Sequence, residues 1–266
     1  MSGKIETRLR ELGLTLPDAP APAANYVPFV ITGNLVHVSG QISQNASGLI
    51  KGKLGADLDI AAELGNNAHR LSLEGSRIEP EPSVFDPEAI ARYRAILQAC
   101  HDRGLEQMVT LHHFSNPLWL TEKGDFSSEI VVDYFRRYVA KVVAELGDLV
   151  SKWITINEPI TYAVMRYLTG EFPHGKRTGI GALFEAIHNM LRCHATAFHT
   201  IKESRPEALV GTANNMQVFE ARPGGNAIDR LWVGQIDRLY NNSWQDALHT
   251  GRYRGIIGSK RIKHLA

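Results

Sequence analysis

Thr155-Ile156-Asn157-Glu158-Pro159 is the stretch that decides the fold of this chain. The residues ahead of Asn157, from Trp153 to Ile156, are aromatic or β-branched, a pattern typical of a buried strand. Pro159 has no N–H to donate to a neighbouring strand, so the strand is predicted to end before it. Asn157 and Glu158 are therefore predicted to lie at the carboxyl end of a strand, where α/β proteins bind their ligands.

A carboxylate beside an amide has a definite chemical use at such a position. It suits proton delivery to a sugar oxygen, together with a hydrogen bond from the amide to a sugar hydroxyl. The alternative is a glutamate that ends a strand and faces solvent. The rest of the sequence has to decide between the two.

Composition narrows the class of protein. The chain has 266 residues, which fit one large α/β domain or two small ones. Its hydrophobic content of 44% and charged content of 21% are ordinary for a globular protein. The net charge is +1 and the basic end, residues 259–264, is short, so we interpret it as solvated. We expect no nucleic-acid partner.

Cysteines and termini indicate the compartment. Cys100 and Cys193 fall within helical patterns and are interpreted as small core residues, which favours a reducing compartment. Residues 1–14 are charged and contain no apolar signal segment. No run approaches the roughly 18 apolar residues of a membrane span. We therefore expect a cytoplasmic protein without a membrane partner.

Two regions of different character meet near residue 60. Residues 15–26 are rich in Pro and Ala and are predicted to be extended. Residues 29–32 and 35–40 flank Gly33-Asn34, which predicts a β-hairpin. Asp57 or Asp59 is predicted to cap a helix that begins at Ile60.

From about residue 63, strands alternate with helices, which implies a parallel sheet built from βαβ units. Asp86-Pro87 is a good helix start, and Gly104 and Gly147 are predicted helix ends. The four-residue spacing of Ile130, Tyr134, Tyr138 and Val142 predicts the buried face of the second helix. The predicted strands are 69–73, 108–111, 153–157 and 209–214, and the predicted helices are 86–103, 128–146 and 182–203.

Each of the four predicted strands carries polar residues at or near its end. Because the carboxyl ends of parallel strands meet at one edge of a sheet, these residues are predicted to share one site. The alternatives are a structural ion pair for Arg70 and plain turns for the asparagines. The residues are Arg70 and Glu74, residues 112–116, Asn157 and Glu158, and Asn214 and Asn215.

Metal and phosphate sites are not favoured. His112 and His113 are adjacent, so on a strand they face opposite sides and cannot easily bind one metal. No glycine-rich phosphate loop follows any predicted strand. The aromatic rings of Phe114, Trp119 and Trp153 suit stacking on sugars, and they suit the core equally well.

Three motifs resemble glycoside hydrolase family 1. Residues 69–80 resemble its second-strand motif, residues 110–119 its third and residues 155–159 its fourth. The resemblance covers about residues 63–266 and is specific. It implies an α/β fold, a partial or rearranged TIM (β/α)8-type barrel, and the activity of a retaining β-glycosidase on β-glucoside-type substrates, with no cofactor and no metal.

The resemblance also implies roles for individual residues. Glu158 would be the general acid/base, and Arg70 would orient the nucleophilic carboxylate. In substrate binding, Asn157 would contact the sugar 2-hydroxyl, His113 would contact other sugar hydroxyls, and Trp119 would lie near the entrance.

The sequence departs from this family at several points. The first strand of the family, the Thr-Glu-Asn-Gly type segment that carries the nucleophile, and the later Trp and Glu are not found. The roughly 204 residues after residue 62 are fewer than a family barrel needs. Because retaining hydrolysis needs two carboxyl groups, we expect a truncated glycosidase that is impaired or inactive.

The first part of the chain resembles a different family. Residues 26–42 are similar to the start of Rid (YjgF-like) proteins, which are small trimeric imine deaminases. The expected domains are therefore a Rid-like fragment at 1–62 and a partial glycosidase barrel at 63–266. The alternative function is a non-catalytic sugar-binding or Rid-like oligomeric module in a fusion of two gene fragments. The expected partners are a β-glycoside or small sugar and further copies of the chain in a homo-oligomer.

Overall fold

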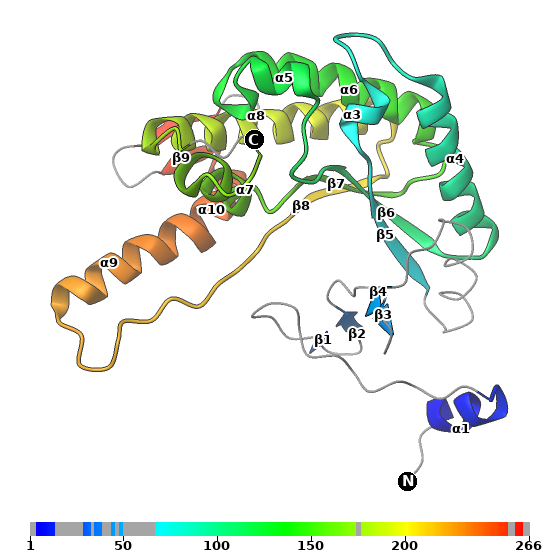
Figure 1. Cartoon of the computed structure of the whole chain (residues 1–266), viewed down its shortest axis with the longest axis horizontal. Coiled ribbons are helices and arrows are strands. Elements are labelled where there is room, and N and C mark those ends of the chain that lie inside the picture. Colours follow the sequence, from blue (N-terminus) through cyan, green and yellow to red (C-terminus); the bar gives the residue numbers. More distant parts are fainter. Residues whose placement is uncertain are drawn as a thin grey trace. The chain divides into compact units, whose positions relative to one another are not determined.

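Four parallel strands, paired in chain order, form the sheet of the larger part of the molecule (Figure 1). They are β5 (Ala68–Ser72), β6 (Glu106–His112), β7 (Lys152–Asn157) and β8 (Leu209–Ala213). The four predicted strands are confirmed, each shifted by no more than two residues at either end. The computed structural model describes residues 4–13, 29–32, 35–38, 44–45, 48–49, 67–173, 177–254 and 259–262.

A long helix follows each of the first three strands and leads to the next. These helices are α4 (Pro87–Asp102), α6 (Ile130–Leu146) and α8 (Ile180–Ser204). They pack side by side next to the sheet, with α6 in contact with both α4 and α8. Strands in sequential parallel order with connecting helices make an α/β fold of the (β/α)8-barrel type, of which four strands are described here.

The ends of α4 follow the predicted capping chemistry. The Asp86 carboxylate accepts hydrogen bonds from the backbone N–H of Glu88 at 2.8 Å and of Ala89 at 3.3 Å. Pro87 occupies the first helical position, where its missing N–H costs nothing. Gly104, beyond the last turn, has φ +70°, a left-handed conformation that glycine adopts without steric strain.

The predicted buried face of α6 is wrong at one residue. Tyr134, Tyr138 and Val142 are at most 5% exposed, whereas Ile130 is 42% exposed. Each step of four residues turns about 40° past a full helical turn, so three steps turn about 120° and leave the buried face. Val131, which lies next to Ile130, is fully buried.

β7 is the most deeply buried of the four strands. From Trp153 to Asn157 every residue is at most 8% exposed. Its pairing with β8 is regular up to Ile154 and shifts register between Ile154 and Asn157. Such irregularities bend a strand and redirect the side chains at its end.

Short elements follow the carboxyl ends of the strands. After β5 comes α3 (Gly75–Ile78), and after β6 come α5 (Leu118–Glu122) and the 3-10 turn η1 (Asp125–Ser127). After β7, α7 (Pro159–Ala163) continues directly into the π-helical segment η2 (Val164–Thr169). β8 is followed by α9 (Ala227–Asp237), the π-helical segment η3 (Arg238–Asn242), α10 (Ser243–Thr250) and the hairpin of β9 (Arg252–Arg254) and β10 (Ser259–Arg261).

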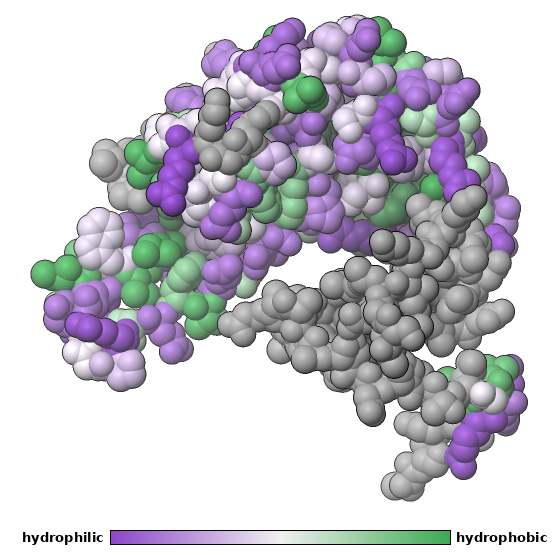
Figure 2. All heavy atoms as spheres, viewed as in Figure 1, coloured by the Kyte–Doolittle hydropathy of each residue, from purple (hydrophilic) through white to green (hydrophobic). Residues whose placement is uncertain are grey.

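α9 has an uncovered apolar face. None of its residues is buried. Four of its apolar residues, spaced at helical intervals, are between 46% and 63% exposed. Figure 2 shows hydrophobic side chains gathered at this end of the molecule, where α9 extends from the rest of the fold in Figure 1. The four residues are Ile228, Leu231, Trp232 and Ile236.

The chain divides into two compact units, Met1–Asp57 and Leu58–Ala266. In the first unit, β1 (Phe29–Thr32) and β2 (Leu35–Val38) pair antiparallel, which confirms the predicted hairpin. The unit also contains α1 (Lys4–Glu11) and the short pair β3 (Gln44–Asn45) and β4 (Gly48–Leu49). The helix predicted from Ile60 lies outside the described residues.

Cys100 in α4 and Cys193 in α8 are both buried and free, as expected for core residues. In the described part of the chain, no helix is both long enough and apolar enough to cross a membrane.

Candidate active site

Arg70 links three neighbouring strands near their carboxyl ends. Its Nε donates to Thr110 Oγ1 on β6 at 3.0 Å, and its Nη2 donates to Asn157 Oδ1 on β7 at 2.5 Å. Burial lowers the pKa of Arg70, and the nearby charge of Glu158 acts in the opposite direction. Arg70 was expected to belong to a shared site or to form a structural ion pair. The structure shows it as a hydrogen-bonded bridge between strands, with the predicted site residue Asn157 as one of its partners.

The side-chain amide of Asn157 has its oxygen held and its nitrogen available. The residue is 2% exposed, and its Oδ1 is taken by Arg70. Among the described residues, no hydrogen-bond partner is found for its Nδ2. Because a buried N–H without a partner is costly, this donor is suited to a ligand oxygen.

His113 lies on the exposed side of β6, at its end. Its Nδ1 shares a hydrogen bond of 2.7 Å with Ser72 Oγ on β5. Burial is the largest cause that lowers the pKa of His113; the positive charge of Arg70 also lowers it, and Glu158 raises it. His113 is therefore neutral near pH 7, and its imidazole can both donate and accept hydrogen bonds.

His112 points the other way, as predicted for adjacent strand residues. It is 5% exposed and contacts the rings of Phe126 and Tyr162 edge-on, at centroid distances of 4.9 and 5.2 Å. Burial lowers its pKa to about 4. In the described ranges no group of three or more His, Cys, Asp or Glu side chains could hold a metal ion.

Glu158 occupies a strained position between β7 and α7. Its φ of 42° and ψ of 61° lie in the left-handed region, which a residue with a Cβ adopts at a steric cost. Its N–H donates to the carbonyl of Ala213 on β8 at 2.6 Å, which fixes the backbone there. The carboxylate is partly buried, and its Oε2 accepts a long hydrogen bond of 3.4 Å from Asn215 Nδ2. Strained residues of this kind gather at functional sites.

A small pocket lies beside Glu158. It is formed by the start of α7, the end of β8 and the segment from η3 to α10. In the wall of this pocket, Tyr240 Oη lies 2.8 Å from Thr161 Oγ1. Tyr240 Oη also accepts a hydrogen bond from Gln217 Nε2 at 3.2 Å. The residues that line the pocket are Glu158, Pro159, Ile160, Thr161, Asn214, Asn215, Tyr240, Trp244 and Gln245.

Glu74 is a second carboxylate at this edge of the sheet, but it is engaged locally. It caps α3 by accepting hydrogen bonds from Ser76 N at 3.2 Å and Ser76 Oγ at 2.7 Å, and it also accepts one from Ser115 Oγ at 2.7 Å. Burial acts to raise its pKa, but the hydrogen bonds from Ser115 and Ser76 outweigh burial and the pKa is lowered.

Trp119 is tied to other neighbours. Its Nε1 donates to the carbonyl oxygen of Glu79 at 3.2 Å, and its ring meets Tyr134 edge-on at 5.1 Å. Lys123 Nζ lies 5.7 Å from the ring centroid. The Trp119 ring therefore contacts the packing around α6. The indole of Trp153 is 2% exposed and belongs to the core, and Phe114 packs partly buried against the core.

The structure brings four of the five predicted site residues together: Arg70, His113, Asn157 and Glu158 are linked by the contacts and charge interactions above. Thr110 and Ser72 support this group and were not predicted. Ser72 lies two residues after Arg70 and faces Thr110 in the β5–β6 register, so strand periodicity could have found both. No strand periodicity or other local sequence pattern identifies Tyr240 as a site residue.

Polar side chains that converge at the carboxyl ends of sequential parallel strands define an α/β fold of the barrel type with a candidate ligand site at that edge. The family model described as glycosyl hydrolase family 1 matches residues 38–264. The chain belongs to this family.

Similar proteins include both sequences and solved structures. The chain is 32% identical to the 6-phospho-beta-galactosidase of Streptococcus equi subsp. zooepidemicus, over 77% of this chain and 44% of that protein. A beta-glycosidase from Pyrococcus horikoshii superimposes with a TM-score of 0.70 and 36% identity, over 79% of this chain and 48% of that one. The family 1 β-glucosidase from Thermotoga maritima gives a TM-score of 0.71 and 28% identity, over 76% and 45%. The chain thus spans less than half the length of these relatives.

Proposed function

We propose that this chain is a β-glycosidase-type module that binds a β-glycoside or small sugar at the carboxyl ends of β5 to β8. The observation that carries the proposal is the bridge from Arg70 to Asn157, which leaves Asn157 Nδ2 buried and free beside Glu158. A sugar hydroxyl could accept a hydrogen bond from this amide, and the neutral imidazole of His113 could bind another hydroxyl.

In this proposal Glu158 is the general acid/base. An acid must lie within hydrogen-bond reach of the leaving oxygen. Glu158 is partly buried and lines a pocket, and within the described part of the chain its carboxylate accepts only a long hydrogen bond, from Asn215, so its carboxyl group is available for proton transfer. Arg70 then holds the amide and contributes positive charge, and its role in orienting a nucleophilic carboxylate remains part of the proposal. Trp119 near the sugar entrance also remains a proposal.

We further propose that hydrolysis by this chain alone is impaired. A retaining mechanism needs a second carboxyl group about 5 Å from the acid. Both carboxylate oxygens of Glu74 already accept hydrogen bonds, Oε1 from Ser76 and Oε2 from Ser115, so it is a poor substitute for a free nucleophile. Because the nucleophile segment of the family is not found in the sequence, sugar binding should survive better than turnover.

The test uses the full chain and two aryl substrates, a β-glucoside and a 6-phospho-β-galactoside, since relatives carry both kinds of name. Glucoimidazole, the ligand of one solved relative, serves as the binding probe in calorimetry. We expect binding of glucoimidazole that weakens at least about tenfold in Glu158→Gln, with little or no hydrolysis. Absence of both binding and hydrolysis in the wild-type chain would refute the proposal.

A second candidate concerns residues 1–62. We infer that they are a Rid-like fragment that promotes oligomerisation in a fusion of two gene fragments. The antiparallel hairpin of β1 and β2 supports this inference, because the similarity to the Rid family covers it. Sedimentation analysis of the full chain should give a trimer. A monomer at micromolar concentration would argue against this role.

A further inference from the structure

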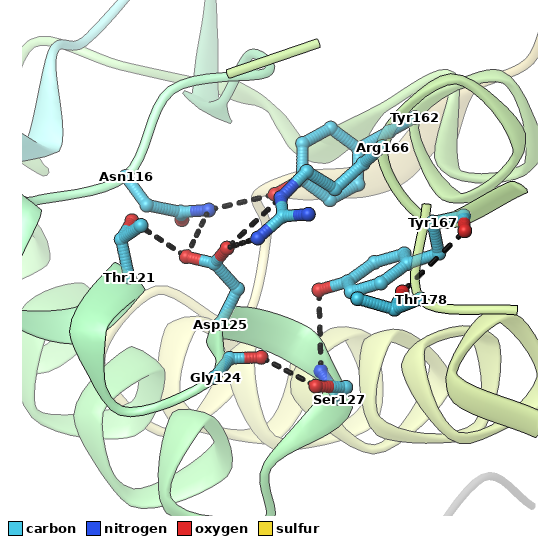
Figure 3. Close-up of polar contacts among 9 residues, drawn as sticks. All are labelled: Asn116, Thr121, Gly124, Asp125, Ser127, Tyr162, Arg166, Tyr167 and Thr178. Carbon is cyan, nitrogen blue, oxygen red and sulfur yellow. Dashed lines mark hydrogen bonds and ion pairs between the residues drawn. The ribbon is translucent and has the colours of Figure 1, made fainter. Parts of the chain in front are cut away.

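A buried ion pair connects the segment after β6 with the segment after β7 (Figure 3). Arg166 Nε and Nη2 donate to Asp125 Oδ2 at 3.2 and 2.9 Å. Asp125 is fully buried and Arg166 is 6% exposed. The Arg166 guanidinium also lies 4.9 Å from the ring centroid of Tyr167. The pair is therefore shielded from water on both sides.

The second oxygen of Asp125 is engaged as well. Its Oδ1 accepts hydrogen bonds from Thr121 Oγ1 at 2.6 Å and from Asn116 Nδ2 at 3.3 Å. The same Asn116 amide donates to Tyr162 Oη at 2.8 Å (Figure 3). Asn116 therefore connects Tyr162 to the carboxylate that binds Arg166. A carboxylate with donors on both oxygens is fixed in orientation as well as in position.

Asp125 is held against its own backbone preference. Its φ is +51°, in the left-handed region, although the residue is not a glycine. The turn it begins is also tied down, since Ser127 N–H donates to Tyr167 Oη at 3.2 Å and Asn189 Nδ2 donates to the carbonyl of Phe126 at 2.9 Å. Backbone strain of this kind persists only where surrounding contacts over-determine it.

The pair leads directly to Glu158. Tyr162 and Arg166 belong to the continuous segment of α7 and η2, which begins at Pro159, the residue after Glu158. The backbone N–H of Tyr162 donates to the carbonyl of Glu158 at 2.9 Å. A shift of this segment would therefore move the backbone of Glu158. Segments with π-helical geometry are frequent at functional sites.

Stability alone is a weak reason for such a pair. Two charges lose their hydration on burial, and apolar residues of similar size often stabilise a fold as well or better. What two hydrogen bonds from one guanidinium to the same carboxylate oxygen add is a fixed direction between the two segments that carry them.

We propose that Asp125 and Arg166 are positioning residues for Glu158. They hold α7 and η2 against the segment after β6, so that Glu158 keeps its left-handed backbone and its carboxylate stays beside Arg70, His113 and Asn215. The inference rests on the proposed role of Glu158 as acid/base, but its main test does not need turnover.

The main test follows Glu158 itself by NMR. Glutamate carboxyl groups are labelled with ¹³C, and the Glu158 signal is assigned by its loss in Glu158→Gln. The chemical shift of this signal and the hydrogen exchange of the Tyr162 amide are then measured in Asp125→Asn and in Arg166→Lys. Asp148→Asn, which breaks the exposed pair of Arg94 and Asp148, is the matched control.

We expect Asp125→Asn to shift the carboxyl signal of Glu158 and to raise the exchange rate of the Tyr162 amide at least about tenfold. Arg166→Lys should give a smaller change of the same kind, and it serves as the test if Asp125→Asn does not fold. Asp148→Asn should change neither quantity. An unchanged Glu158 carboxyl signal in a folded Asp125 or Arg166 variant would overturn the proposal, even if overall stability falls.

The outcome is separable from that of the proposed function. If the wild-type chain neither binds glucoimidazole nor hydrolyses aryl glycosides, the proposed function fails while the NMR result still decides the positioning role. If hydrolysis is measurable, Asp125→Asn should slow a phenyl glycoside at least about tenfold more than a dinitrophenyl glycoside, because only the poorer leaving group needs a well-placed acid. Equal losses on both would contradict a positioning role.

Discussion

Arg70 reaches across the whole of β6 to hold Asn157, with Nη2 at 2.5 Å from Oδ1. On the way, its Nε bonds to Thr110 on the intervening strand. The order β5-β6-β7 thus brings together residues that lie 87 positions apart in the sequence. The amide orientation at the site is therefore set by an arginine and not by the asparagine's own strand.

Replacing Arg70 by Met should affect binding and stability together. Thr110 and Asn157, which are both buried, would lose their shared charged donor, which costs about 1–3 kcal/mol of unfolding free energy. Glucoimidazole affinity should fall at least about tenfold, because the Asn157 amide becomes free to rotate. Urea unfolding and calorimetry measure the two effects. A stable variant with unchanged affinity would show that the bridge does not orient the amide.

The strained backbone of Glu158 predicts an unusual effect of glycine. Because Glu158 has φ +42°, Glu158→Gly should be more stable than Glu158→Gln by about 1 kcal/mol, since glycine removes the left-handed strain. The control is Gln98→Gly in the exposed face of α4, where glycine should cost about 1 kcal/mol. Urea unfolding of the variants compares them. If glycine lowered the free energy of unfolding at position 158, relative to glutamine, as much as it does at position 98, Glu158 would not be strained.

Two buried histidines predict an acid-sensitive fold. Burial lowers the pKa of both His112 and His194 from 6.5 to about 4. Between these values the unfolded chain binds more protons than the folded one, so stability falls as the pH drops from about 6.5 to about 4. Each histidine contributes a slope of roughly 1.4 kcal/mol per pH unit at most.

Replacing either histidine should remove its share of this pH dependence of stability. His112→Phe, which keeps an aromatic ring against Phe126 and Tyr162, should make the fall in stability less steep between pH 4 and 6.5, as should His194→Gln. Denaturant unfolding at several pH values measures the slope. If both variants keep the wild-type slope, other groups cause the acid sensitivity.

The uncovered face of α9 predicts that its apolar side chains contribute little to folding. Leu231, which is 62% exposed, should change stability by less than about 0.5 kcal/mol when replaced by Ala. Leu191 in α8 is fully buried, and the same replacement there should cost about 2–5 kcal/mol. Leu231→Lys should also reduce binding of an apolar dye. A large loss of stability from Leu231→Ala would show that this face is covered in solution.

Local chemistry made much of the fold predictable. Asp86 with Pro87 marks the start of α4, Gly104 follows its end, and the aromatic and β-branched run before Asn157 is β7. These signals work because capping bonds, left-handed turns and strand burial depend on residues close in sequence. The exposed position of Ile130 was missed because a strict four-residue spacing drifts away from the buried face.

The site was predictable only as far as strand ends reveal it. His113, Asn157 and Glu158 each sit at or next to a strand terminus, Arg70 lies in the middle of the short strand β5, and parallel order brings these strands together. The pairing of Asp125 with Arg166 joins residues that lie 41 positions apart in two short turns, with no period or motif to connect them. Contacts of this kind depend on how the turns pack, which no local pattern encodes.

The shifted pairing of β7 with β8 makes the site sensitive to chain length. Asn157 faces Ala213 only because the register changes after Ile154. Side chains alternate between the two faces of a strand, so removing one residue within β8 would move Asn215 to the place of Asn214 and Asn214 to that of Ala213, which turns each toward the opposite face. A single-codon deletion would therefore alter this site without changing any of its side chains, and descendants of this chain should vary more freely in residue type along β8 than in the number of residues it contains.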